Sequence, residues 1–350
     1  MTCLFPASSA AARPPDIELM DVAPEGAPPG PTADAAVKQR IVGGSTTTIA
    51  SFPWQVSLNL DSRFGAPNDF VDHWCGGTLI TPRIVQTAAH CVVAADPDDG
   101  FTSNMETNDV DVVLGKTTLS TTGGQRQNVI AIAIDADYDE NTQDFDAAWI
   151  VLESASAQTP LKIAGSGETA LWASGAATTV TGWGATSEGG PQSDTLKVAT
   201  TPIIADATCD SFGGLYVFFN ATNMVCAGVL SGGTDSCQGD SGGPLQAPGF
   251  VGAAPTQRLV GVVSWGEGCA QPNKPGVYTR IAGPEYNPFV QNVVDTLESG
   301  NGLPDAGSVY GSGATTSPPS APATPGKKCK KGQKLKKGKC VKKKRKKKKK

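Results

Sequence analysis

The feature of this chain that most limits its fold is a long series of short apolar runs, each bounded by Gly, Pro, Asn or Asp. Between residues 41 and 298 the runs include WQVSLNL, DVDVVLG, NVIAIAI, AAWIVL, ATTVTGW, RLVGVVSW and GVYTRI. About a dozen strands of this length, at such spacing, favour antiparallel barrels or a sandwich. The clearest helical pattern lies at residues 287–299, where the apolar positions fall on one face of a helix. We therefore expect an all-β domain that ends in a helix.

Composition divides the chain into four parts. Residues 1–40 are rich in Ala, Pro, Asp and Glu and are predicted to be a disordered leader, ahead of the domain at 41–298. Residues 299–326 have the Gly, Ser, Thr and Pro content of a linker, and residues 327–350 form a basic tail. The tail holds 17 of the 29 Lys and Arg residues and no acid, which leaves 12 basic against 33 acidic residues elsewhere. An acidic body with a basic tail is therefore expected.

The nine cysteines indicate an exported protein in an oxidising compartment. There is no C-x-x-C pair, which disfavours a zinc site. The first residues, MTCLFPASSAAARPP, make a poor secretory signal, so either the true start differs or the export route is unconventional. No apolar run reaches the roughly 18–20 residues of a transmembrane helix. Six cysteines lie in the body and allow 15 pairings, among which spacing does not choose: Cys75, Cys91, Cys209, Cys226, Cys237 and Cys269.

The segment DSCQGDSGGP, residues 235–244, is poor material for a helix or a plain strand because glycine weakens both. It predicts a backbone shaped for close approach to a ligand, with a hydroxyl presented at its tip. A serine hydroxyl is a weak nucleophile at neutral pH and needs a base beside it, which in turn needs an orienting carboxylate. The chain offers two histidines as the base, His73 and His90.

Eight motifs then occur in a fixed order: IVGG, FPWQVSL, WCGGTLI, TAAHC, VTGWG, DSCQGDSGGP, VSWGEGC and KPGVYTR. In this order they resemble the trypsin-like serine proteases of the chymotrypsin fold, over residues 41–298. The resemblance implies two six-stranded antiparallel β-barrels with the catalytic residues between them, followed by the C-terminal helix. It also implies a monomeric serine endopeptidase, secreted as a zymogen, that acts on protein or peptide substrates without a cofactor or a metal.

By the same resemblance, Ser241 is the expected nucleophile, His90 the general base and acid, and Asp146 the orienting carboxylate. The backbone N–H groups of Gly239 and Ser241 are expected to form the oxyanion hole. His73 matches a histidine that is often structural in the family.

The alternative to Asp146 as the orienting carboxylate is Asp144, two residues earlier. Phe145 also stands where the family usually has Asn. The apolar run that begins directly after Asp146 favours it over Asp144.

Substrate preference follows from Asp235, six residues before Ser241. In trypsin-like relatives this position forms the floor of the specificity pocket, where a buried carboxylate needs a cationic partner. A Lys or Arg of the substrate supplies one, so we expect cleavage after Arg or Lys. The alternative is a surface aspartate in a loop. The expected pocket walls are Ser264, Trp265, Gly266 and Gly276.

The resemblance also implies three disulfides and a route of activation. The expected pairs are Cys75–Cys91, Cys209–Cys226 and Cys237–Cys269. Cleavage after Arg40 frees the α-amino group of Ile41, which is expected to pair with Asp240. Because the leader ends VKQR, the mature enzyme is a candidate to cut its own zymogen.

The sequence allows more than one interpretation of the acidic insertion and of the basic tail. Calcium-binding relatives use carboxylates in a first-barrel loop, whereas residues 116–134 contain no acid. The acidic insertion at 94–111 lacks EF-hand spacing, which favours a solvated loop over a calcium site. The tail has three candidate roles: an anchor that binds polyanions or anionic surfaces, a tethered substrate, or a segment removed during maturation. We expect an anchor that is eventually trimmed. Rival functions are an inactive homologue that serves as a binding module, and a protein whose main activity resides in the tail.

Overall fold

The computed structural model describes residues 41–61, 68–95, 102–251, 254–300, 309–310, 333–336 and 339–342. The predicted leader, including Arg40, lies outside these residues, as do most of the predicted linker and tail. The chain divides into two units, residues 1–311 and residues 312–350. Within the described parts of the chain, no helix is long and apolar enough to cross a membrane.

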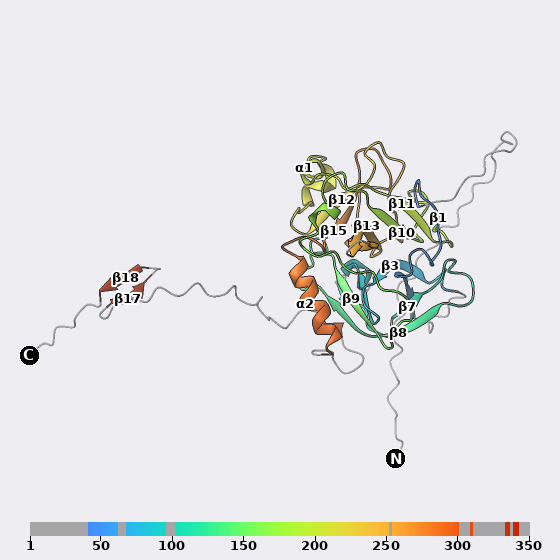
Figure 1. The fold of residues 1–350 in the computed structure, drawn as a ribbon, viewed down its shortest axis with the longest axis horizontal. Coiled ribbons are helices and arrows are strands. Elements are labelled where there is room, and N and C mark those ends of the chain that lie inside the picture. Colours follow the sequence, from blue (N-terminus) through green and yellow to red (C-terminus); the bar gives the residue numbers. More distant parts are fainter. Residues whose placement is uncertain are drawn as a thin grey trace, which may run out of the picture. The chain divides into compact units, whose positions relative to one another are not determined.

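The first half of the domain is a closed barrel of six antiparallel strands (Figure 1). The strand order is β8-β7-β2-β3-β4-β9, and a further pairing of β8 with β9 closes the ring. Both faces of the shorter strands are buried, which matches the continuous apolar runs in the sequence. The strands are β2 (Gln55–Leu60), β3 (His73–Leu79), β4 (Ile84–Thr87), β7 (Val110–Leu114), β8 (Gln125–Ile134) and β9 (Ala148–Leu152).

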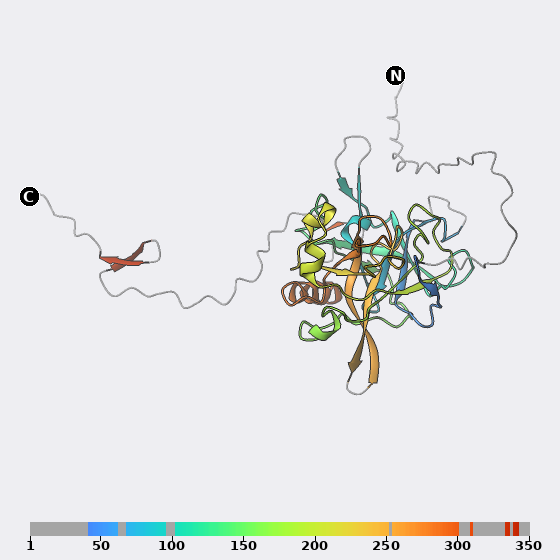
Figure 2. The same cartoon turned by 90° about the horizontal axis from the view of Figure 1, so that it is seen from above.

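The second half is a curled sheet with the order β1-β11-β10-β13-β14-β15-β12. Its long β13–β14 ribbon projects from the domain in Figure 2. The strands are β1 (Ser45–Thr46), β10 (Thr179–Gly182), β11 (Lys197–Thr200), β12 (Met224–Ala227), β13 (Pro244–Val251), β14 (Ala254–Trp265) and β15 (Gly276–Thr279). The all-β, chymotrypsin-type fold expected from the sequence is thus confirmed.

The second barrel closes differently from the first. Its seam is an isolated bridge between Ile203 and Ala227, flanked by hydrogen bonds from Gly228 N–H to the Pro202 carbonyl (3.0 Å) and from Ile204 N–H to the Cys226 carbonyl (2.9 Å). Pro202 has no N–H to donate, so a regular ladder cannot run through it. Among the described residues, pairing along this seam is therefore limited to the single bridge, and no longer ladder forms there.

Helix α2 (Asn287–Glu298) matches the predicted C-terminal helix, and its buried Val290, Val294 and Leu297 join the core of the first barrel. The short elements are η2 (Ala89–Cys91), β5 (Val93–Ala95), β6 (Thr102–Asn104), η3 (Thr169–Leu171), α1 (Asp206–Asp210) and η4 (Gly214–Phe218). Strand β16 (Val309–Tyr310) pairs in parallel with β8, although it falls within the predicted linker. In the second unit, β17 (Gln333–Lys336) and β18 (Lys339–Lys342) form a hairpin.

Buried polar contacts join the two halves of the domain. Trp54 Nε1 donates to Gln246 Oε1 (2.8 Å), which links the first barrel to β13. Thr181 Oγ1, on β10, donates to Gln55 Oε1 on β2 (2.6 Å). Satisfied hydrogen bonds of this kind fix one relative arrangement of the two sheets, because a buried polar group left unpaired is costly. The site described next is assembled from loops of both halves.

Candidate active site

Strand pairing brings His90 and Asp146 together. Thr87, the last residue of β4, pairs with Ala148, the first residue of β9. His90 follows β4 in η2, and Asp146 precedes β9, so the register places both at one end of the barrel. His90 Nδ1 donates to Asp146 Oδ2 (2.8 Å), and the His90 backbone N–H donates to Asp146 Oδ1 (2.9 Å). The contact through Nδ1 leaves Nε2 of the imidazole as the nitrogen available to a reacting group.

Asp146 is fully buried and held from two further directions. Ser264 Oγ donates to Asp146 Oδ2 (2.5 Å), and Thr279 Oγ1 donates to the Asp146 carbonyl (2.7 Å). Burial by itself raises the pKa of Asp146, but His90 and the Ser264 hydroxyl outweigh it and lower that pKa overall. The sequence placed Ser264 only in a pocket wall, so its bond to Asp146 is an addition from the structure.

The pKa of His90 moves in the opposite direction. Burial disfavours the imidazolium and lowers the pKa, whereas the adjacent Asp146 carboxylate raises it by more, so the pKa ends above its usual value of 6.5. An imidazole of raised basicity, held in one tautomer, is suited to accept a proton and return it.

Ser241 lies on a tight loop that only glycine allows on either side of it. Gly239 has φ +90° and Gly242 has φ +78°, and a Cβ on Gly239 would lie 2.6 Å from Gln192 Nε2. The loop is tied to the first barrel by Gly76 N–H, which donates to the Ser241 carbonyl (2.7 Å). Among the described residues, the N–H groups of Gly239 and Ser241 donate to no protein acceptor. Two such free donors beside a hydroxyl can receive a developing oxyanion.

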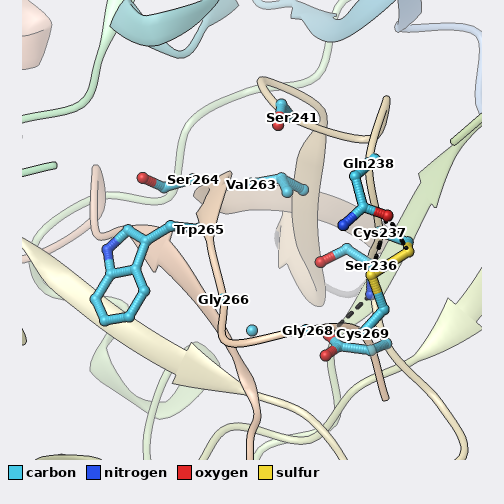
Figure 3. Close-up of a pocket in the computed structure, with 12 residues that line it drawn as sticks. Ser236, Cys237, Gln238, Ser241, Val263, Ser264, Trp265, Gly266, Gly268 and Cys269 are labelled. Carbon is cyan, nitrogen blue, oxygen red and sulfur yellow. Dashed lines mark hydrogen bonds between the residues drawn. A yellow bond between two sulfur atoms is a disulfide. The ribbon is translucent and has the colours of Figure 1, made fainter. Parts of the chain in front are cut away.

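A pocket opens below Ser241 (Figure 3). Ser236, Cys237 and Gln238 form one wall, and Trp265 and Gly266 lie across from them. All five residues predicted for the pocket line it: Asp235, Ser264, Trp265, Gly266 and Gly276. The pocket is also lined by four residues that were not predicted from the sequence: Ser236, Gln238, Val263 and Gly268. Each of these residues is adjacent in the sequence to a predicted site residue, and this adjacency could have been used to predict them.

Asp235 is a buried carboxylate in this pocket, with 2% of its surface exposed. It accepts hydrogen bonds from Ser236 N–H (2.8 Å) and Ala270 N–H (3.2 Å). A Cβ on Gly276 would lie 2.8 Å from Asp235 Oδ1, so the glycine keeps access to the carboxylate open. Burial raises the pKa of Asp235 to about 7. In the described part of the chain no Lys or Arg forms an ion pair with it.

Asp240, beside the nucleophile, is a second buried carboxylate. It accepts hydrogen bonds from Gly184 N–H and Cys237 N–H, each at 2.9 Å, and burial raises its pKa to about 7. Ile41 is fully buried in the core of the second half. Next to it, the Val42 carbonyl accepts a hydrogen bond from Asp235 N–H (3.1 Å). The IVGG segment thus contacts the loop that carries the pocket.

His73 lies under the same loop rather than beside Asp146. Its Nε2 donates to the Gly239 carbonyl (3.1 Å), and its Nδ1 contacts Ser57 Oγ (2.7 Å). Burial lowers the pKa of His73 to about 4, so the ring is neutral at physiological pH. A neutral, fully packed histidine agrees with the structural role expected for it.

The three expected disulfides are present: Cys75–Cys91, Cys209–Cys226 and Cys237–Cys269. The first anchors the residue after His90, and the third borders the pocket. Cys75, His90 and Cys91 lie close enough to share a metal, but both sulfur atoms are already bonded to each other. That cluster therefore lacks thiolate ligands.

Comparison with known proteins agrees with this geometry. The trypsin family model matches residues 41–290. A trypsin of Saccharopolyspora erythraea is 38% identical over 253 residues, covering 72% of this chain and 98% of that protein. Trypsin alpha-4 of Lucilia cuprina is 40% identical (69% of this chain, 84% of that protein), and a trypsin of Sus scrofa is 35% identical (73% and 96%). The chain belongs to the trypsin family of serine endopeptidases.

Proposed function

We propose that the protein cleaves peptide bonds after Arg or Lys, through a triad of Ser241, His90 and Asp146. The observation that carries this proposal is Asp235, a buried carboxylate without a cationic partner among the described residues, in the pocket that Ser241 lines. A guanidinium or ammonium group of the substrate pairs with Asp235, while an apolar side chain leaves a buried charge unpaired. The cost of burying the carboxylate therefore favours substrates with Arg or Lys over substrates with an apolar side chain at this position.

In the proposed reaction, Ser241 Oγ attacks the carbonyl carbon while His90 Nε2 removes its proton. The carbonyl oxygen gains negative charge and accepts hydrogen bonds from Gly239 and Ser241 N–H. Asp146 keeps the proton of His90 on Nδ1 and stabilises the imidazolium. His90 then protonates the leaving amine, which departs and leaves an acyl-enzyme. Water attacks this ester with His90 again as base, and Ser241 recovers its proton.

We also propose that cleavage after Arg40 activates the protein. A free α-amino group on Ile41 is cationic near neutral pH, and Asp240 is a buried carboxylate on the pocket loop that lacks an ion pair within the described ranges. Pairing of the two would lower the pKa of Asp240 and fix the loop that bears Gly239 and Ser241.

We further propose that the protein is secreted, that it is a monomer, and that its basic tail binds polyanions. The three disulfides support an oxidising compartment. The 17 basic residues of the tail support binding to a polyanion by counterion release.

A fluorophosphonate probe tests the triad, because it reacts with serine hydroxyls that a neighbouring base activates. Ser241 Oγ displaces fluoride from phosphorus, and the hydroxyl proton leaves with the fluoride. Mass spectrometry of protein that begins at Ile41 should find one adduct, on Ser241. His90→Ala protein should label far more slowly, and Ser241→Ala protein should not label. An adduct on a different serine would refute the assignment.

A further inference from the structure

The loop between β8 and β9 carries Asp146 at its end and holds strained backbone. Asp135 N–H donates to the Ala147 carbonyl (3.0 Å) and closes the base of this loop. Within it, Gln143 has φ +58° and Phe145 has φ +52°. Left-handed backbone is unusual for a bulky side chain such as phenylalanine, and such strain persists only where the surroundings enforce it. The residue directly before Asp146 therefore needs an external support.

Tyr286, just before α2, contacts both ends of this loop. Its hydroxyl donates a hydrogen bond to Asp135 Oδ2 at the first end. Its ring meets the ring of Phe145 edge-on at the second end, with centroids 5.5 Å apart. On its other side Tyr286 stacks on Phe289 of α2 (5.7 Å). Tyr286 is 4% exposed, so its ring and hydroxyl are enclosed by these contacts.

We infer that Tyr286 is a positioning residue for Asp146, acting through Asp135 and Phe145. Both contacts converge on Ala147, the neighbour of Asp146: its carbonyl accepts from Asp135, and its N–H donates to the Phe145 carbonyl (2.7 Å). Ser264 and Thr279 hold the carboxylate and the carbonyl of Asp146 from the second half of the domain. Tyr286 contacts the loop that carries Asp146, and so supports it from the other side. This role rests on the proposed function of Asp146 in the triad.

Electrostatics of the loop make the Tyr286 hydroxyl important. Asp135 is buried, and burial raises its pKa to about 6, while hydrogen bonds from Tyr286 and Asp137 N–H oppose this rise. The charged groups that act on it, Asp137 and Asp144, are both acidic and raise the pKa further. Loss of the hydroxyl leaves a poorly solvated carboxylate at the base of the loop. The loop can relieve this only by moving or by taking up a proton.

The test compares two tyrosine-to-phenylalanine variants in protein that begins at Ile41, with rates expressed per titrated active site. Tyr286→Phe removes the hydroxyl and keeps the ring. Tyr138→Phe is the matched control, because its hydroxyl is on the same loop but bonds only to Gln143 in the described residues (3.3 Å).

Tyr286→Phe should lower kcat about 10- to 100-fold with little change in KM, because a small displacement of a catalytic group has effects of this size. The acid limb of its kcat–pH profile should also shift to lower pH, since His90 loses part of the support from Asp146. Equal kcat and equal pH midpoints in the two tyrosine variants would overturn the inference, as would a change in KM alone. An inactive wild type would count against the proposed function instead.

Discussion

Three buried aspartates in the site have different partners, and the partners set their pKa values. Asp146 has the His90 imidazole and the Ser264 hydroxyl, which bring its pKa below the usual value despite burial. Asp235 and Asp240 have only neutral hydrogen-bond donors among the described residues, and burial raises the pKa of each to about 7. The last two carboxylates each match a cation of the proposed function: the substrate side chain for Asp235 and the Ile41 α-amino group for Asp240.

Asp235 should make binding of a small amidine such as benzamidine dependent on pH. The free carboxylate titrates near 7 in the folded protein and near 3.9 when unfolded, so stability without ligand falls as pH rises between these values. A bound cation needs the ionised form, so its binding should strengthen with pH until Asp235 is ionised. Benzamidine should therefore raise Tm more at pH 8 than at pH 5.

The matched control for this experiment is Asp235→Asn, which keeps the shape of the side chain and removes its charge. Its Tm should respond little to benzamidine at either pH. An equal rise in Tm for wild type and variant would show that the amidine binds elsewhere.

At the scale of elements, much of the fold was predictable because local patterns determine it. The alternation of apolar runs and turn residues predicted strands, and residues 287–299 predicted α2 to within one residue of its end. Position relative to distant segments was not predictable. The bond from Ser264 to Asp146 spans 118 residues, and the contact of Tyr286 with Asp135 spans 151. The single bridge at the seam of the second barrel likewise depends on how β12 packs beside the segment that contains Pro202.

The loop of Ser241 provides a test at this scale. Gly239→Ala should lower kcat about 100- to 1,000-fold, the loss typical of one missing oxyanion donor, because the new Cβ clashes with the backbone of Gly184, whose Cα would lie 3.2 Å away, and this displaces the peptide. Gly123→Ala is a suitable control, since Gly123 has φ +97° and nothing within 4 Å of an added Cβ. Steady-state kinetics on both variants distinguishes the effect of the clash at residue 239 from the effect of placing alanine at a positive φ, which both variants share. Similar losses of kcat in the two would contradict the account.

At the scale of the whole molecule, the sequence combines an acidic body with a basic tail, and the proposed activation makes activity depend on cleavage after Arg40. Full-length protein with an intact Arg40–Ile41 bond should be nearly inactive, and cleavage at that bond should activate it. Activity of the cleaved form should fall as pH rises past the α-amino pKa, ordinarily about 7.7–8.0 and raised by the pair with Asp240. Asp240→Asn protein, cleaved in the same way, should remain nearly inactive. A fully active Arg40→Gln protein that cannot be cut would refute this mechanism.

The tail should confer binding to heparin that weakens steeply with salt, because its cations displace condensed counterions. Chromatography of full-length Ser241→Ala protein against the same protein ending at residue 300 measures this, and the inactive background prevents trimming. The shortened protein should not be retained, since its body is acidic. Equal retention of the two would place the binding surface elsewhere.

The most direct measurement is kcat/KM for paired peptides that differ only in Arg or Phe before the cleaved bond, using protein that begins at Ile41. Arg should be preferred by about 30- to 5,000-fold, which corresponds to the roughly 2–5 kcal/mol at stake when a buried charge is left unpaired. Ser241→Ala should abolish the activity on Arg, and Asp235→Asn should remove the preference. A preference for Phe, or turnover that survives Ser241→Ala, would contradict the proposed function.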